Sequence, residues 1–222
     1  MSFPIYDFKK DIRNVLVKPE IRARIFHMKA GEKVNLYDKA LSHSHDLGYE
    51  IFLILQGKVR GLIDGEEGIL GPGQMCIAAP HQTHAFEVIG EEDVIMYLSV
   101  TPHVQPTHTF YDSEGNRLPN NFMPNSSYDL SDQIQKPIDI LLDEQIEITN
   151  NLLTAIKNFN SNQEIIIDRL KTQIDKNDYD SISEQRNQLW SELISVFEET
   201  FKLGDIWNNI APNLPNKKGD EN

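Results

Sequence analysis

The sequence predicts a mainly β fold that is followed by an α-helical region, and a change in the period of the apolar residues separates the two. The first hundred residues contain many glycines, and apolar runs of strand length lie between them. These runs are IRARIFHM, YEIFLILQ, KVRGLID, QMCIAA, HAFEVI and VIMYLSV. Many short strands at close, regular spacing are typical of an all-β barrel or sandwich. From about residue 137 the apolar residues recur with a helical period instead.

Two features of the β half predict how its strands are arranged. Asp64-Gly65 separates two of the runs, and this dipeptide favours a tight hairpin. The run YEIFLILQ is apolar on both of its alternating faces. A strand of this kind must be covered on both faces. We expect the barrel interior to cover one face, and a partner subunit or the C-terminal helices to cover the other.

The second half is expected to hold a connection and then three helical segments. Residues 106–128 are rich in Pro, Asn and Ser, which indicates an extended linker. Pro137 suits the first position of a helix that continues to about residue 159, and a second helical segment covers about 164–176. Ser181 and the glutamate three residues later have capping-box spacing and predict the start of a third helix, which Gly204 would end.

These patterns divide the chain into four parts. We expect a β-barrel domain over 1–105, the linker over 106–128, an α-helical region over 129–210, and a disordered tail over 211–222.

Composition excludes several classes of function. The formal net charge is −13, and no basic cluster interrupts it, so nucleic-acid binding is not expected. The only cysteine is Cys76, which rules out an intrachain disulfide and a Cys-rich zinc site. No apolar stretch approaches a membrane span, and the apolar run in MSFPIYDFKKD is too short for a signal peptide. We therefore expect a cytoplasmic protein that binds no membrane.

Four residues form a candidate metal site. His43 and His45 are two residues apart, so their side chains point the same way if the segment is extended. A turn then brings Glu50 beside them on the next strand, and His84 opens a later strand. Three imidazoles and a carboxylate inside a barrel suit a divalent transition metal and leave positions open for substrate. A polar rim around an empty barrel is the alternative.

The expected substrate pocket lies beside this site. Phe52, Ile54, Met75 and Phe86 would form an apolar wall, and His81 would lie at the barrel mouth. An apolar wall keeps a site partly dry and strengthens its electrostatic interactions.

The same residues resemble the two sequence motifs of the cupin superfamily. His43-Ser-His45, four residues, Glu50, six residues and Gly57 match the first motif. The second motif matches from Gly73 to His84 in spacing, although Ala79, His81 and Val88 replace its proline, glycine and asparagine. The resemblance covers about residues 15 to 105 and is that of a compact single-domain cupin with a C-terminal helical extension.

The resemblance implies a double-stranded β-helix, or jelly roll, with His43, His45, Glu50 and His84 as metal ligands. In some proteins of this kind the carboxylate also handles protons, so Glu50 is the candidate catalytic residue. The resemblance does not define the reaction, because cupins include dioxygenases, isomerases, decarboxylases, sensory domains and storage proteins.

Four further basic residues are expected to lie outside the site. His103 and His108 belong to the connecting stretch and are expected to have ordinary loop roles. Arg22 and Arg24 share a strand face with Phe26. If that face points inward, one arginine could bind a substrate carboxylate; solvent exposure is expected instead.

Three functions remain open. The leading hypothesis is an oxygenase that acts on a small organic molecule with one divalent metal ion, for which iron(II) is expected and manganese, nickel or zinc would also fit. A non-catalytic binding or regulatory cupin with a helical dimerisation module is the first alternative. A sugar isomerase is the second, disfavoured because no Lys/Arg cluster or glycine-rich phosphate cradle lies near the motifs. A homodimer is expected from the strand that is apolar on both faces and from the apolar stripes of the C-terminal helices.

Overall fold

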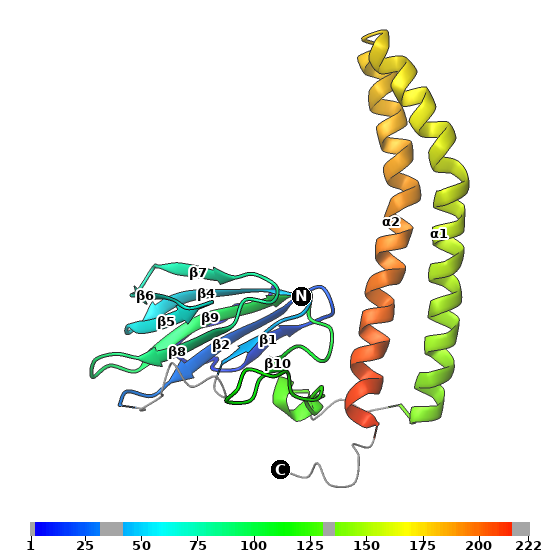
Figure 1. Ribbon diagram of the computed structural model, residues 1–222. Helices are drawn as coiled ribbons and strands as arrows, with labels where there is room; N and C mark the ends of the chain where they lie inside the picture. Colours follow the sequence, from blue (N-terminus) through cyan, green and yellow to red (C-terminus); the bar gives the residue numbers. More distant parts are fainter. Residues whose placement is uncertain (1–2, 32–41, 131–135, 215–222) are drawn as a thin grey trace. The chain divides into compact units, whose positions relative to one another are not determined.

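The structure is a computed structural model that describes residues 3–31, 42–130 and 136–214. The chain divides into two compact units, of which one contains residues 1–134 and 211–222 and the other contains residues 135–210. Figure 1 shows that the first unit is built from strands and the second from two long helices.

In the part of the chain that the structure describes, the β unit contains two five-stranded antiparallel sheets. In spatial order the first sheet contains β1 (Asn14–Val17), β2 (Arg22–Met28), β9 (Val94–Thr101), β4 (Tyr49–Gln56) and β7 (Met75–Ala78). The second contains β10 (Thr109–Phe110), β3 (His43–Ser44), β8 (His84–Val88), β5 (Val59–Ile63) and β6 (Glu66–Leu70). This arrangement confirms the predicted jelly-roll β barrel followed by helices, and each of the six predicted runs forms a strand.

The core of the β unit lies between the two sheets. Phe52, Ile54 and Met96 from the first sheet and Val59 from the second are almost completely buried in it. Phe86 and Val88 of β8 pack against this cluster from the second sheet. Alternate residues of β4 and of β8 therefore point inward, as the period-2 pattern requires.

The predicted hairpin at Asp64-Gly65 is confirmed. Ile63 pairs with Glu66 across β5 and β6, which leaves only two residues in the turn. Both turn residues have positive φ angles, 51° for Asp64 and 86° for Gly65. Asp and Gly adopt this conformation more readily than other residues, which explains why the dipeptide forms the turn.

Residues 106–128 are not an extended linker, which corrects the prediction for this segment. Thr109 and Phe110 form β10 and pair with β3, and a short 3₁₀ helix covers Asn125–Tyr128. Tyr128 is buried, and the neighbouring Asp129 accepts hydrogen bonds from the backbone and side-chain N–H groups of Asn14 at 2.8 and 2.9 Å. The polar composition therefore serves turns and hydrogen bonds within the β unit.

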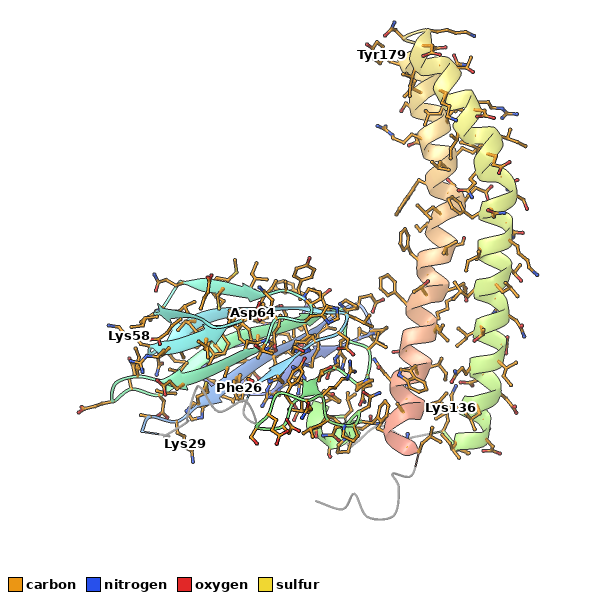
Figure 2. The ribbon with its side chains drawn as sticks, in the orientation of Figure 1. Phe26, Lys29, Lys58, Asp64, Lys136 and Tyr179 are labelled. Carbon is orange, nitrogen blue, oxygen red and sulfur yellow. The ribbon has the colours of Figure 1, made fainter. Side chains whose placement is uncertain are left out.

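The second unit is an antiparallel pair of helices, α1 (Ile138–Asp175) and α2 (Tyr179–Ile210). Figure 1 shows the two helices side by side along their lengths. Tyr179 lies at the turn end of the pair and Lys136 at the opposite end (Figure 2). A cluster of Leu141, Ile206 and Ile210 is buried near the end opposite the turn.

Three predictions about the helices were wrong. The segments predicted up to residue 159 and over 164–176 form one helix, because the polar residues between them include no proline or glycine to interrupt it. The second helix starts at Tyr179, where the Asp178 carboxylate accepts hydrogen bonds from the backbone N–H and hydroxyl of Ser181. Gly204 is buried inside this helix and does not end it, since Ile206 and Ile210 continue the packing face.

The predicted disordered tail begins instead with a 3₁₀ helix at Ala211–Asn213, and residues 215–222 lie outside the described part of the chain. Among the described residues, no helix combines the length and apolar character of a membrane span.

Gly57 provides a test of packing between β4 and β9. It has a φ angle of +74°, and a Cβ atom here would lie 2.6 Å from the backbone oxygen of Asp93. Gly65 has a similar φ of +86°, but a Cβ atom there would meet no atom within 4 Å. We expect Gly65→Ala to lower the free energy of unfolding by about 1 kcal/mol from backbone strain, and Gly57→Ala by roughly 3 kcal/mol because overpacking is added.

Urea unfolding followed by circular dichroism would measure both changes. Tryptophan fluorescence is unsuitable, because Trp190 and Trp207 both belong to the helical unit. If the two variants lose the same free energy of unfolding, the contact with Asp93 does not contribute to the effect of Gly57→Ala.

Candidate metal centre

Four side chains of the β unit converge on one point. The possible ligand atoms of His43, His45, Glu50 and His84 all lie within 4.8 Å of one another. His43 in β3 and His84 in β8 are directly paired in the second sheet, whereas Glu50 belongs to β4 in the first. The structure thus brings together all four predicted residues, and they reach the site from both sheets.

Backbone carbonyl groups orient two of the three imidazoles. Nδ1 of His45 is hydrogen-bonded to the carbonyl oxygen of Thr107, and Nδ1 of His84 lies 3.0 Å from the carbonyl oxygen of Gln82. A carbonyl oxygen only accepts, so Nδ1 carries the proton in both rings. In the neutral rings Nε2 then has the free lone pair, and a partner on the other nitrogen is the usual support of a metal-bound histidine.

These Nε2 atoms face the same carboxylate oxygen. Glu50 Oε2 lies 2.7 Å from Nε2 of His45 and 2.8 Å from Nε2 of His84. Nε2 of His43 lies 3.8 Å from that oxygen and has no hydrogen-bond partner among the described residues.

The arrangement therefore fits a cation. The lone pairs of the imidazole Nε2 atoms and the carboxylate oxygen of Glu50 are all hydrogen-bond acceptors, so they repel each other unless a positive charge lies between them. Extra protons on His45 and His84 would relieve two contacts but would leave His43 Nε2 unpaired. One divalent ion serves all three nitrogens and the carboxylate, a donor set that transition metals such as iron, nickel and zinc accept.

Electrostatics keep the carboxylate and His43 in the forms that ligate a metal. Burial raises the pKa of Glu50, but the imidazoles of His43, His45 and His84 beside its carboxylate outweigh this effect and hold the pKa well below its ordinary value. Burial lowers the pKa of His43, and the nearby His84 and His45 lower it further, against an opposing effect of Glu50. At neutral pH Glu50 is therefore ionised and His43 is neutral.

A cavity of about 330 Å³ lies beside the cluster, and His43, Glu50 and His84 form part of its wall. Its volume is in the range of small-molecule sites, about 300–1,000 Å³. The rest of the wall is mainly apolar and includes Phe26, Met28, Phe52, Ala85, Phe86, Met96, Leu98 and Met123. Phe26, on β2, is labelled in Figure 2.

Two of the five predicted pocket residues line this cavity, namely Phe52 and Phe86. Ile54 is fully buried in the core and does not reach the cavity wall. The side chain of His81 is 74% exposed and lies at a turn with a φ angle of 69°, outside the cavity.

Met75 was also predicted to line the pocket, and this prediction was wrong. In the register of β4 and β7, Met75 lies opposite Leu53, whereas Cys76 lies opposite the inward-facing Phe52. Cys76 consequently packs against the core, and Met75 is 57% exposed. The pairing register was not available from the local sequence.

Two arginines reach the cavity, against the expectation that they would be exposed. Arg22 and Arg24 line its wall, and Arg22 is only 5% exposed. Nη2 of Arg22 lies 3.9 Å from Oε1 of Glu50. The sequence did indicate an inward position, because both arginines alternate on the same strand face as Phe26 and Met28. Their charge nevertheless led to the prediction that they face solvent.

Two histidines that were expected to have ordinary loop roles also lie near the cluster. His108 lines the cavity, with its ring centroid 4.7 Å from that of His43 and 5.0 Å from that of His45. Burial, reinforced by His43, His45 and Arg22, holds the pKa of His108 well below its ordinary value. His103 is almost fully buried and contacts the ring of Tyr128. Neither residue belongs to a recognisable local motif.

Residues 24–101 match the family model described as a cupin domain. A comparison with curated proteins gave no match.

Several solved structures are similar to part of this chain. A Klebsiella pneumoniae protein with a double-stranded β-helix domain is 21% identical with a TM-score of 0.42, over 48% of this chain and 89% of its own. The DMSP lyase DddQ of Ruegeria pomeroyi is 21% identical with a TM-score of 0.37, over 44% of this chain and 46% of its own. A salicylate 1,2-dioxygenase variant of Pseudoaminobacter salicylatoxidans is 14% identical with a TM-score of 0.33, over 38% of this chain and 22% of its own. These likenesses are too distant to carry an argument about activity.

The burial of His103 predicts a pH dependence of stability. Burial lowers its pKa to about 3, and the nearby Arg22 and His45 contribute. The unfolded chain takes up this proton below about pH 6.5 and the folded chain does not, so acid favours unfolding. Between about pH 6.5 and 4, we expect metal-free wild type to lose about 1.4 kcal/mol per pH unit more than His103→Asn.

Urea unfolding of chelator-treated protein at several pH values would measure this difference. His81→Asn, which changes an exposed histidine, is the control and should keep the wild-type slope. If His103→Asn also keeps that slope, His103 is protonated in the folded chain.

Proposed function

We propose that this protein, whose residues 24–101 match the family model of a cupin domain, is a metal-dependent enzyme, an oxygenase that acts on a small organic molecule. One observation carries the proposal: three imidazole nitrogens and one carboxylate oxygen converge at the wall of a largely apolar cavity. His43, His45, Glu50 and His84 would hold one divalent transition-metal ion.

Iron(II) is the ion that we propose, and manganese, nickel and zinc suit the same donor atoms. When bound, iron(II) would supply the redox chemistry that activates dioxygen. Four protein ligands leave positions open on an octahedral ion. The cavity provides space for substrate on the side of the cluster that His43, Glu50 and His84 line.

The residues of the chain have separate roles in this proposal. The apolar wall, including Phe52 and Phe86, binds the substrate body and excludes water. Glu50 is ionised and combines the roles of ligand and proton acceptor. His108 is neutral at pH 7 and borders the same cavity, so its ring can hydrogen-bond to a bound substrate.

A non-catalytic binding module is the second candidate, and the helical unit favours it. Both long helices keep large apolar side chains in contact with solvent, among them Ile146, Leu153, Trp190 and Phe197. A minimal enzyme has no need for such a surface, whereas a sensor could use it to contact a partner protein. Ligand binding without turnover in fully metallated protein would support this candidate.

The sugar isomerase alternative requires a new argument. Its main objection was the lack of basic residues near the motifs, yet Arg22 and Arg24 line the cavity. The apolar character of the remaining wall now provides the objection, because the hydroxyl groups of a sugar need many hydrogen-bond partners when they are buried. Turnover of a sugar phosphate would reverse this ranking.

We also propose that the chain forms a homodimer through the outer face of the first sheet. Tyr49, Met75 and Ile77 on this face are 51%, 57% and 48% exposed. Ile51 and Leu53, on the same face of β4, are half-buried. Together they form an apolar patch on neighbouring strands, a feature that marks interaction surfaces.

Metal content is the direct test of the proposed site. Protein purified without chelator or added metal should contain about one transition-metal ion per chain. The double variant His43→Ala, His45→Ala should lose nearly all of it, because two of the four ligands are absent. Elemental analysis measures the metal, and an oxygen electrode with small aromatic and carboxylate substrates tests for oxygenase activity.

His81→Ala is the matched control and should retain wild-type metal content, because its side chain lies outside the cavity. Circular dichroism checks that each variant is folded. Wild-type protein without any transition metal, or equal metal content in the double variant, would contradict the proposal.

Light scattering tests the dimer. At micromolar concentration the wild type should have about twice the chain mass of 25.5 kDa. Ile77→Lys should shift it to the monomer, because a charge then lies in the apolar patch. Ile69→Lys changes a similarly exposed isoleucine of the second sheet, which is 59% exposed, and should remain dimeric. A monomeric wild type would exclude the dimer.

A further inference from the structure

Two cationic side chains line the cavity, and each has a hydrogen-bond donor that is unpaired among the described residues. Arg22 is 5% exposed, and Arg24, two residues along the same strand, is half-buried. Both line the cavity, and the Nε atom of each is buried without a hydrogen-bond partner among the described residues. Buried guanidinium groups are costly unless an anion pairs with them.

The anions of the protein compensate these charges only in part. Among the described residues, the nearest carboxylate oxygen to Arg22 is Glu50 Oε1, at 3.9 Å from Nη2, which exceeds a hydrogen bond. The other oxygen of Glu50 faces the three histidines. Asp129 attracts Arg24 but already accepts two hydrogen bonds from Asn14.

The cavity is therefore positive inside an acidic protein. Of the described residues in its wall, two carry guanidinium groups and only one, Glu50, carries a carboxylate, and a bound divalent ion would add further positive charge. The net charge of the whole chain is −13, so this positive charge is local to the cavity. An anionic ligand is favoured there over a neutral or cationic one.

Aromatic rings hold both guanidinium groups in place. Cζ of Arg24 lies 4.4 Å from the ring centroid of Phe26, and Cζ of Arg22 lies 5.6 Å from that of Tyr128. Contact with a ring uses the face of a guanidinium and leaves its N–H edge available. The planar edge of an arginine matches the two oxygens of a carboxylate.

We propose that the cavity binds a small organic carboxylate, with its carboxylate group on Arg22 and Arg24 and its apolar body against Phe26, Phe52 and Phe86. This inference deepens the proposed function, since it names the substrate class of the same site. A cavity of about 330 Å³ holds on the order of ten non-hydrogen atoms at about 30 Å³ per water-sized volume. Benzoate and hexanoate have this size and chemistry.

Titration calorimetry on the full chain tests the proposal, with benzoate and hexanoate against the uncharged benzamide and hexanamide. Each acid should bind at least tenfold more tightly than its amide, because only the acid forms charge-assisted hydrogen bonds. Arg22→Gln and Arg24→Gln should weaken binding of the acids by about tenfold to a hundredfold and leave amide binding unchanged. Arg24→Lys, which keeps the charge but not the planar edge, should have an intermediate effect.

Arg13→Gln is the matched control, because it removes the same charge from an exposed position of the β unit and should not change binding. Thermal unfolding shows which variants are folded. If Arg22→Gln does not fold, the half-buried Arg24→Gln decides the question.

The outcomes separate this inference from the proposed function. Arginine-dependent acid binding in protein that contains no metal would support the carboxylate site and contradict the metal site. Metal-loaded protein that binds acid and amide equally would overturn the carboxylate site alone. Acid binding that survives both arginine variants but disappears on chelation would also overturn it, because the ligand would then be held by the metal. Tighter competition by inorganic phosphate than by either acid would overturn the choice of a carboxylate.

Discussion

The convergence of three imidazole nitrogens on one buried carboxylate oxygen is the constraint on which the rest of the β unit depends. Glu50 comes from the first sheet, and His43 and His84 come from paired strands of the second, so the site exists only when both sheets are assembled. The backbone carbonyls of Thr107 and Gln82 then determine which nitrogen of His45 and His84 faces the carboxylate. The geometry of the cluster therefore depends directly on the assembly of the two sheets.

The segment after β9 completes the site, although its composition resembles that of a linker. It provides the carbonyl that orients His45, the ring of His108 beside the cluster, and Tyr128 and Met123 in the cavity wall. Its two-residue strand pairs with β3, which contains His43. Polar and proline-rich composition describes how the backbone turns, but it does not reveal whether a loop packs on a site.

In the helical unit, the period of the apolar residues predicted where helices form but not where each helix ends. The apolar stripe identified the helical region correctly, because a period of 3.6 is a local property. It did not show that α1 continues through the polar residues near position 160 or that α2 continues past Gly204. Both continuations depend on packing between the helices, which offsets the weak helix propensity of single residues.

The sequence alone determined the β-then-α order, the six main strands, the tight turn at Asp64-Gly65 and the four residues that converge at the site. Each of these depends on short spacings along the chain or on alternation within a strand, which local backbone geometry converts into direction. Only the tertiary structure decided that Cys76 rather than Met75 faces inward, that Arg22 and Arg24 line the cavity, and that His103 and His108 are buried near the cluster of His43, His45, Glu50 and His84. These features depend on strand register and on contacts between residues far apart in the chain. The charge of a side chain does not by itself predict exposure, because a cavity can accommodate an arginine.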